Sequence, residues 1–290
     1  MAPERLITDV RQLTCMHFEM DVSLDHTLGC GQAHRWRKQA DGSWQGVIEN
    51  EVVVLRQTAS GFDCEGASEK GAVLGYFRAQ DDLDEIVRDI SMRDSYVASL
   101  SVHCPGLRIL QQPTWECLAT YILATNVNVG RIAKMVESIC DRFGTDLGRR
   151  RAFPAPKQIL DCAEEIGECR LGFREGRFLE LAGRVEGGGI DIEGMGELGY
   201  EELTQELQTI SGVGPKVADC VALFGYGRLE AFPVDVRIRN ILSRRYGVEG
   251  GYARASAFGR SRFGRYAGYA QEFLYHSDFI AHKTGARPHT

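Results

Sequence analysis

The spacing of the apolar residues changes once along this 290-residue chain, and that change limits the possible folds more than any other feature. Up to about Cys64, short runs such as "MHFEMDVSL" and "SWQGVIENEV" alternate apolar with polar residues, and turns such as "ADGS" separate them. From "TWECLATYILATNVNVGRIAKMVESICDRFG" onward, apolar residues recur every three or four positions. The pattern predicts an α+β protein with an antiparallel sheet domain over residues 1–104 and a helical domain over 105–290.

The helical spacing also predicts individual elements. Residues 78–94 hold apolar side chains at helical spacing with acids in the first turns, which predicts a helix packed against the sheet. Further helices are expected at 156–166, 174–184, 200–209, 215–224, 236–246 and 264–281.

Charge is distributed unevenly along the chain. Residues 1–104 carry 10 Lys and Arg against 17 Asp and Glu, whereas residues 105–290 carry 24 against 23. The segment 237–265 holds eight arginines and one acid, which predicts a basic surface for a polyanionic partner. A solvated charged face is the alternative interpretation.

The nine cysteines are scattered, show no zinc-ligand spacing, and do not occur after Cys220. They are expected to be free thiols in a reducing compartment, with no cysteine-ligated iron-sulfur cluster. The start, "MAPERLITDVRQ", lacks an apolar signal-peptide core, and no apolar run approaches the roughly 18 residues of a membrane span. We therefore expect an intracellular, soluble protein without a membrane partner.

The segment 203–224, "LTQELQTISGVGPKVADCVALF", is typical of a helix-hairpin-helix motif. Pro215 stands at the favoured first position of the second helix, and Gly212 and Gly214 allow a close turn. The free amides at that helix start can then face a DNA phosphate without reading the sequence. A tight connection between two core helices is the structural alternative.

Two side chains near this motif suggest chemistry. Lys216 lies in the first turn of the second helix, where the helix dipole disfavours a positive charge and should lower the lysine pKa. A free amine there could act as a nucleophile and form a Schiff base. Asp235, in "PVDVR", reads as a helix N-cap, and its carboxylate could also stabilise a cationic sugar. Together they predict cleavage of an N-glycosidic bond.

Five motifs occur in order along nearly the whole chain: "CGQAHRW", "ATNVNVGRI", "SGVGPKVADC", "PVDV" and "AGYAQEFLY". In these motifs the sequence resembles the 8-oxoguanine DNA glycosylase/AP lyases of the helix-hairpin-helix superfamily. The resemblance implies a TATA-binding-protein-like sheet domain ahead of the helical glycosylase domain. It also implies a monomer that acts on duplex DNA containing 8-oxoguanine opposite cytosine, excises the base and cleaves the strand by β-elimination, with no metal or redox cofactor.

The resemblance implies roles for individual residues. Lys216 would attack C1′ of the damaged nucleotide, and Asp235 would stabilise the charge on the sugar. Gly31 would offer its carbonyl to the N7 hydrogen that distinguishes 8-oxoguanine from guanine. The other residues implied for the extruded base are Gln271 for its Watson–Crick edge, and Tyr275 and Cys220 for its two faces.

Contacts with the orphaned base and the DNA backbone are implied as well. Phe173 would fill the vacated stack as a wedge and stands where the family shows tyrosine. Val127 interrupts a familiar run of asparagines, and Arg237 replaces a familiar histidine beside the aspartate. The remaining DNA-contacting residues implied are Asn126, Asn128, Arg131, Arg174, Gly212, Gly214 and Arg237.

Two other functions fit the same residues. A non-catalytic helix-hairpin-helix module would bind DNA in a salt-sensitive, lesion-blind manner. A glycosylase for a different damaged base would keep the chemistry and change the base contacts. His34 and His276 lie near the site motifs and are assigned no role.

Overall fold

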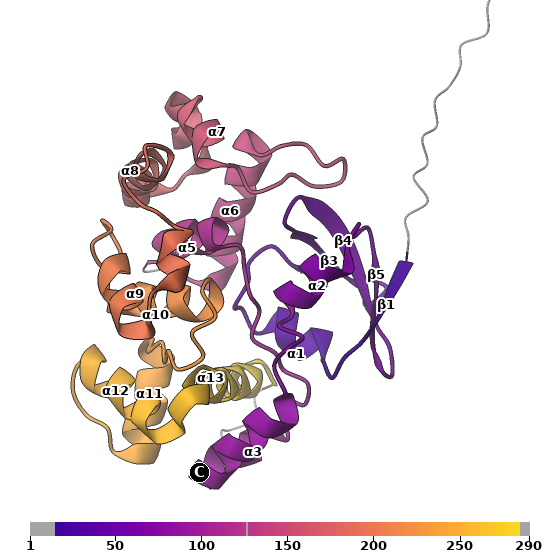
Figure 1. Ribbon diagram of the computed structural model, residues 1–290, viewed down its shortest axis with the longest axis vertical. Helices are drawn as coiled ribbons and strands as arrows, with labels where there is room; N and C mark the ends of the chain where they lie inside the picture. The colour runs from indigo at the N-terminus through magenta and orange to yellow at the C-terminus, as the bar shows by residue number, and fades with distance from the viewer. Residues whose placement is uncertain (1–14, 126, 285–290) are drawn as a thin grey trace, which may run out of the picture.

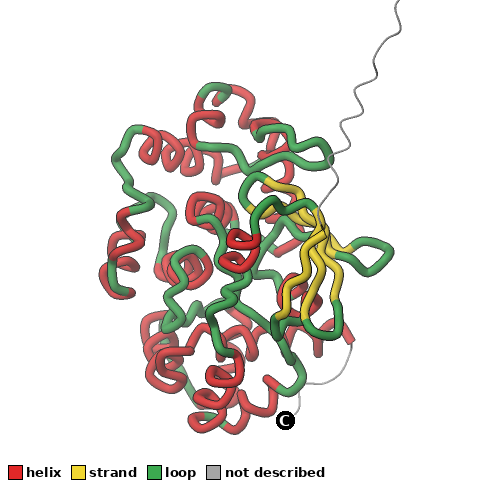
Figure 2. Tube along the Cα trace, turned by 45° about the vertical axis from the view of Figure 1, so that its right-hand side comes forward, coloured by secondary structure: helices red, strands yellow, loops and turns green. Residues whose placement is uncertain are grey.

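The computed structural model describes residues 15–125 and 127–284, with a sheet module on one side and helices on the other (Figure 1). Five antiparallel strands pair in the order β1-β5-β4-β3-β2, and Figure 2 shows the strands side by side in yellow. They are β1 (Cys15–Glu19), β2 (Arg37–Lys38), β3 (Trp44–Ile48), β4 (Glu51–Gln57) and β5 (Gly61–Glu65). The predicted α+β class with an N-terminal antiparallel sheet is confirmed.

The sheet module has its own apolar core, covered by α1 (Leu24–Gly29) and α2 (Lys70–Tyr76). Phe18 and Phe62 stack across two neighbouring strands with ring centroids 5.0 Å apart. Trp36 lies directly on β3 at Gly46, where a Cβ atom would come within 2.4 Å of the indole. Because no side chain fits beneath Trp36, this glycine lets the segment that follows Gly31 pack closely on the sheet.

Helix α3 (Leu83–Arg93) does not pack against the sheet as predicted. Its buried residues Leu83, Ile86 and Ile90 belong to the helical core, together with Val97 of α4 (Ser95–Ser101). An amphipathic spacing shows that one face of a helix is buried but does not identify what covers it. The chain therefore leaves the sheet module after α2 and contributes to its core again only at Leu110.

The remaining helices form the second module. Helices α10 (Pro215–Phe224) and α11 (Val236–Tyr246) begin and end where the sequence predicts, because Pro215 opens the first and Asp235 caps the second. Helix α12 was not predicted: its run of small residues gives weak apolar periodicity, and Gly259 is where the Phe232 ring packs against it. These helices are α5 (Thr114–Leu123), α6 (Val129–Phe143), α7 (Pro156–Leu160), α8 (Glu175–Glu186), α9 (Tyr200–Leu207), α10 (Pro215–Phe224), α11 (Val236–Tyr246), α12 (Tyr252–Phe263) and α13 (Ala267–Thr284).

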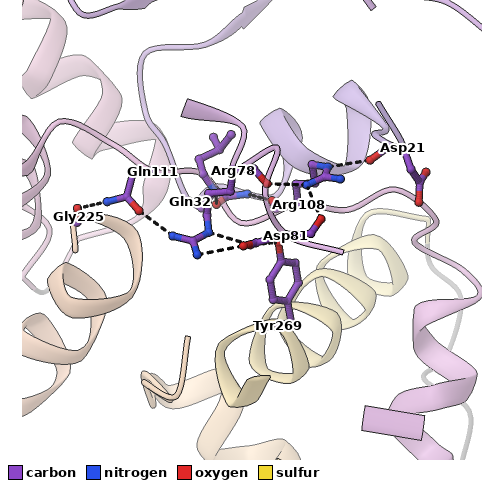
Figure 3. Close-up of polar contacts among 9 residues, drawn as sticks. Asp21, Gln32, Arg78, Asp81, Arg108, Gln111, Gly225 and Tyr269 are labelled. Atoms are coloured by element: carbon purple, nitrogen blue, oxygen red, sulfur yellow. Dashed lines mark hydrogen bonds and ion pairs between the residues drawn. The ribbon is translucent and has the colours of Figure 1, made fainter. Parts of the chain in front are cut away.

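A buried polar network joins the two modules (Figure 3). Arg78 donates to Asp81 at 2.8 Å and to Gln111 at 2.7 Å, and Gln111 in turn donates to the carbonyl of Gly225 after α10. The Tyr269 hydroxyl of α13 donates to Asp81 at 2.8 Å. One ion pair therefore holds the end of α10 and the start of α13 near the sheet module.

The same network fixes the segment that carries Gly31. Arg108 donates to the carbonyls of Asp21 at 2.7 Å and Arg78 at 2.8 Å. The Gln32 amide donates to the Arg108 carbonyl at 2.8 Å and accepts from the Leu110 amide at 2.8 Å (Figure 3). Since Gln32 follows Gly31 directly, these bonds set the position of Gly31 relative to the helices. Across residues 15–125 and 127–284, no helix has the length and apolarity required to cross a bilayer.

Candidate active site

The hairpin between α9 and α10 has the backbone that the motif requires. Gly212 has φ +86°, a left-handed conformation that glycine adopts easily, and a Cβ atom there would lie 2.8 Å from the Arg177 side chain. Gly214 is exposed and precedes α10, and no side chain of the described residues caps the first amides of that helix. These amides are open to an anion such as a DNA phosphate.

Asp219 of α10 stabilises the hairpin through hydrogen bonds to neighbouring helices. Its carboxylate is buried and accepts three hydrogen bonds, from the Tyr200 hydroxyl at 2.5 Å, the Tyr252 hydroxyl at 2.5 Å and the Ser256 hydroxyl at 3.0 Å. These donors come from α9 and α12, so one carboxylate joins three helices at α10. Sequence reasoning missed this role, although Asp219 lies within the quoted motif.

Lys216 lies half-buried in the first turn of α10. Its Nζ atom is 5.4 Å from the Tyr121 ring centroid, and it hydrogen-bonds the Cys220 thiol one turn along. Burial raises the pKa of Cys220 to about 11, and the lysine charge opposes this rise. Burial and repulsion by Lys216 lower the pKa of His34 to about 4. At neutral pH the amine therefore has a neutral thiol and a neutral imidazole near it.

No carboxylate of residues 15–125 or 127–284 is within ion-pair distance of Lys216. An amine bound in an ion pair must break that contact before its lone pair can attack a carbon atom. The arrangement around Lys216 suits a nucleophile for this reason.

Asp235 caps α11 by accepting from the Ile238 amide at 2.8 Å. Its charge also contributes to the raised pKa values of Cys220, Glu272 and Tyr275, for each of which burial is the larger cause. The carboxylate therefore lies close to the residues predicted to hold the extruded base. The N-cap and electrostatic interpretations of Asp235 are compatible in this geometry.

The predicted base-contacting residues come from both modules. Gly31 has φ +97°, and its Cβ position faces Val129 at 3.7 Å. Gln271 is buried in α13, and its Oε1 atom accepts no hydrogen bond from the described residues. Tyr275 lies one turn further along, with the Arg237 guanidinium 4.7 Å from its ring centroid. A buried acceptor without a donor destabilises a protein by about 1–3 kcal/mol, so a ligand that donates to Gln271 would remove this penalty.

Glu272 is a buried group that sequence reasoning did not single out. Burial raises its pKa to about 7, the Asp235 charge adds to the rise, and a hydrogen bond with the Cys30 thiol opposes it. Cys30 directly precedes Gly31, so this carboxyl lies behind the predicted lesion-reading residue. The only sequence feature that could have pointed to Glu272 is its position in "AQE", next to Gln271.

The predicted wedge and its neighbours form a second group. Phe173 is 62 % exposed, unusual for so large an apolar side chain, on the short 3-10 helix Gly172–Arg174. The Arg174 guanidinium lies 4.1 Å from the Phe173 ring centroid and donates to the Thr125 carbonyl at 3.1 Å. Burial, and then repulsion by Arg131, lower the pKa of Arg174, so a second cation lies within electrostatic reach of Arg174. Asn126 lies outside the described residues.

Two predicted DNA contacts also have structural roles. The Asn128 side chain caps α6 by accepting from the Arg131 amide at 2.9 Å. Arg237 pairs with Asp278 at 3.3 Å while it covers Tyr275. Both residues therefore position elements around the site.

The positive charge predicted for the surface over 237–265 is partly neutralised, because four of its eight arginines form ion pairs with acids of the same chain. These pairs are Arg237 with Asp278, Arg260 with Glu201, Arg262 with Asp94, and Arg265 with Glu85. The other four arginines of the segment, Arg239, Arg244, Arg245 and Arg254, are exposed and form no ion pair among the described residues, and the paired Arg262 and Arg265 are exposed as well.

Comparison with known sequences supports the family that the sequence motifs resemble. A family model described as 8-oxoguanine DNA glycosylase, N-terminal domain, matches residues 16–118. The N-glycosylase/DNA lyase OGG1 of Arabidopsis thaliana is 29% identical to this chain, covering 94% of this chain and 81% of the relative. An N-glycosylase/DNA lyase of Saccharomyces cerevisiae is 28% identical, covering 79% and 69%.

Solved structures share the whole architecture. MBOgg1 in complex with a low-affinity DNA ligand superposes with a TM-score of 0.87 at 30% identity, covering 93% of this chain and 96% of that one. The Clostridium acetobutylicum 8-oxoguanine glycosylase/lyase, bound to double-stranded DNA with cytosine opposite 8-oxoguanine, gives 0.85 at 28% identity, covering 91% and 93%. Because motifs, fold and sequence relatives agree along the chain, this protein belongs to the 8-oxoguanine DNA glycosylase/lyase family.

Proposed function

We propose that this protein is a bifunctional DNA glycosylase/AP lyase that removes 8-oxoguanine opposite cytosine from duplex DNA. The observation that carries this proposal is the setting of Lys216. Its amine lies against Cys220 and Tyr121, and the Asp235 carboxylate acts on the same thiol. Family membership supports the substrate. Such an enzyme would work inside the cell, where the chromosome lies.

Recognition would use both modules, with the sheet module supplying Gly31 and the helical module supplying the chemistry. Extruding the lesion requires a few kcal/mol of unstacking, which Phe173 would offset by entering the vacated space. The base would lie between Cys220 and Tyr275. Gln271 Oε1, which has no donor among the described residues, would accept a hydrogen bond from the Watson–Crick edge.

The chemistry would proceed through the lysine. The Lys216 amine forms a bond to C1′ while the bond from C1′ to the base breaks, and the base leaves with the bonding electrons and takes up a proton. Asp235 stabilises the positive charge that develops on the sugar. Opening of the sugar ring gives a Schiff base, and loss of a C2′ proton then expels the 3′ phosphate. Water finally hydrolyses the imine and frees the lysine.

Borohydride trapping tests the proposal. The wild type, Lys216→Gln and Lys157→Gln would be incubated with a duplex containing 8-oxoguanine opposite cytosine, with an undamaged duplex as control. Lys157 is a suitable control because its side chain is 68% exposed on α7. We expect a covalent adduct with the wild type and Lys157→Gln on the lesion duplex only, and none with Lys216→Gln.

Other outcomes would change the proposal in distinguishable ways. Equal trapping by Lys216→Gln would show that another amine is the nucleophile. Lesion-independent binding without an adduct would favour a non-catalytic DNA-binding module. Adducts formed only on duplexes with other damaged bases would keep the mechanism and replace the substrate.

A further inference from the structure

Three side chains with metal-binding atoms converge outside the proposed active site. His26 is in α1, Cys104 follows α4, and His276 is in α13. One ligand atom from each lies within 4.8 Å of the others, and His26 Nδ1 is 2.9 Å from His276 Nε2. Cys104 and His276 are buried, and His26 is partly exposed. The residues are so far apart in sequence that their spacing gives no signal.

These side chains are held in place by contacts that need no metal. The Gly106 carbonyl accepts from the Ser23 amide at 2.7 Å and from the Thr27 hydroxyl at 3.3 Å, which fixes the Cys104 loop to α1. On the other side, the Cys104 sulfur is 3.7 Å from the Ser277 hydroxyl of α13. The fold therefore holds the three ligand atoms close together without a metal.

We propose that His26, Cys104 and His276 bind a zinc ion that joins the sheet module to the helical module. Imidazole nitrogen together with thiolate sulfur suits Zn²⁺, whereas Mg²⁺ and Ca²⁺ prefer oxygen ligands. A tetrahedral zinc site with Zn–N near 2.1 Å places two nitrogens roughly 3.4 Å apart. The histidine nitrogens would separate by only a few tenths of an ångström, and water or the Ser277 hydroxyl could complete the coordination.

Binding at this site has a defined proton balance. At 2.9 Å, one imidazole donates an N–H to the other, so one of the two facing nitrogens carries a proton. Zinc needs the lone pairs of both nitrogens, so that proton moves to the far nitrogen of the same ring. The Cys104 thiol loses its proton to solvent as the sulfur binds. One proton is thus released for each zinc bound.

The site would stabilise the enzyme without taking part in the proposed reaction. His276 directly follows Tyr275 in α13, and the His26 helix leads to Gly31, so the ion would anchor two segments that hold the base. Its effect should appear in stability and metal binding, which are measurable without DNA. This separates its test from the trapping experiment on Lys216.

Metal titration of the full-length reduced protein, stripped with a chelator, tests the proposal. Zn²⁺, and Co²⁺ as a spectroscopic probe, would be added to the wild type, Cys104→Ser, His26→Gln and Cys169→Ser. Cys169→Ser is the matched control because it removes a buried thiol elsewhere. We expect one equivalent of tightly bound metal in the wild type and Cys169→Ser, with a thiolate-to-cobalt band and intense tetrahedral d–d bands.

Cys104→Ser should lose the charge-transfer band and bind roughly 100-fold more weakly, since even partners behind the ligands change affinity by about 10–100-fold. His26→Gln should show the same loss of affinity, and zinc should raise the Tm of the wild type and Cys169→Ser only. If Cys104→Ser does not fold, His26→Gln decides, because His26 is only partly buried. Absent binding by the wild type, or equal binding by wild type and His26→Gln, would overturn the proposal.

Discussion

Glu272 lies buried beside Cys30 and within the electrostatic reach of Asp235, and its pKa of about 7 has a consequence for stability. The unfolded chain releases this proton near pH 4.5, whereas the folded chain retains it up to about pH 7. The stabilising contribution of the protonated carboxyl is therefore full below pH 4.5 and lost as the pH rises through about 7. An uncharged amide at this position would avoid that loss.

We expect Glu272→Gln to gain stability relative to wild type as the pH rises. The difference in the free energy of unfolding, variant minus wild type, should be up to about 3 kcal/mol larger at pH 8 than at pH 4. Urea denaturation of both proteins at several pH values measures this difference. Glu206→Gln, on an exposed position of α9, serves as the control and should show little pH-dependent difference. A constant difference between Glu272→Gln and wild type across pH would contradict the prediction.

From the sequence alone, the proximity of two candidate site residues could be predicted only where they share a motif. Lys216 and Cys220 are four positions apart on one helix, so the spacing alone places them together. Asp235 carries the local signal of an N-cap. Glu272 had no such signal, because its raised pKa depends on burial and on Asp235 in another helix. The cluster of His26 and Cys104 likewise depends on tertiary contacts.

At the scale of elements, the hairpin between α9 and α10 is joined to its neighbours by the hydrogen bonds that Asp219 accepts. Asp219→Asn replaces one oxygen by an amide that cannot accept from the Tyr252 and Ser256 hydroxyls at the same site. We expect a loss of about 2 kcal/mol in the free energy of unfolding, measured by denaturant titration. Tyr252→Phe, which removes one donor, should lose less.

Asp141→Asn is the control for this experiment, since Asp141 is exposed on α6. A change in stability of Asp219→Asn no larger than that of Asp141→Asn would show that the three hydroxyls find other partners.

Element boundaries were predictable where a side chain fixes them, as in α10 and α11. Helix α12 was missed because small residues give little apolar contrast, and the packing of Phe232 on Gly259 is visible only in three dimensions. Helix α3 was recognised from its spacing but assigned the wrong partner. Local pattern determines which face is buried, and the global topology determines what covers it.

At the scale of the whole molecule, the modules depend on the pair of Arg78 and Asp81. Asp81→Ala would leave the Arg78 charge and the Tyr269 hydroxyl without their acceptor, and we expect a loss of about 3 kcal/mol. Unfolding of the two modules can be followed separately in a Trp115→Phe background, where the remaining Trp36 and Trp44 report on the sheet module while circular dichroism reports mainly on the helices. The two transitions should coincide in the wild type and separate in Asp81→Ala.

Asp84→Ala is the control, because this residue is exposed on α3. Coincident transitions with unchanged midpoints in Asp81→Ala would show that apolar packing alone couples the modules.

The membership of α3 in the helical core affects how the chain can fold during synthesis. Leu83, Ile86 and Ile90 leave the ribosome well before α12 and α13, which complete their core. At about 5–20 residues per second, translation leaves this apolar face uncovered for roughly 10–30 s. The nascent chain must shield it during that interval, and a fragment ending at residue 104 would expose it permanently. Aggregation of such a fragment would therefore reflect a missing partner and not a defect in the sheet.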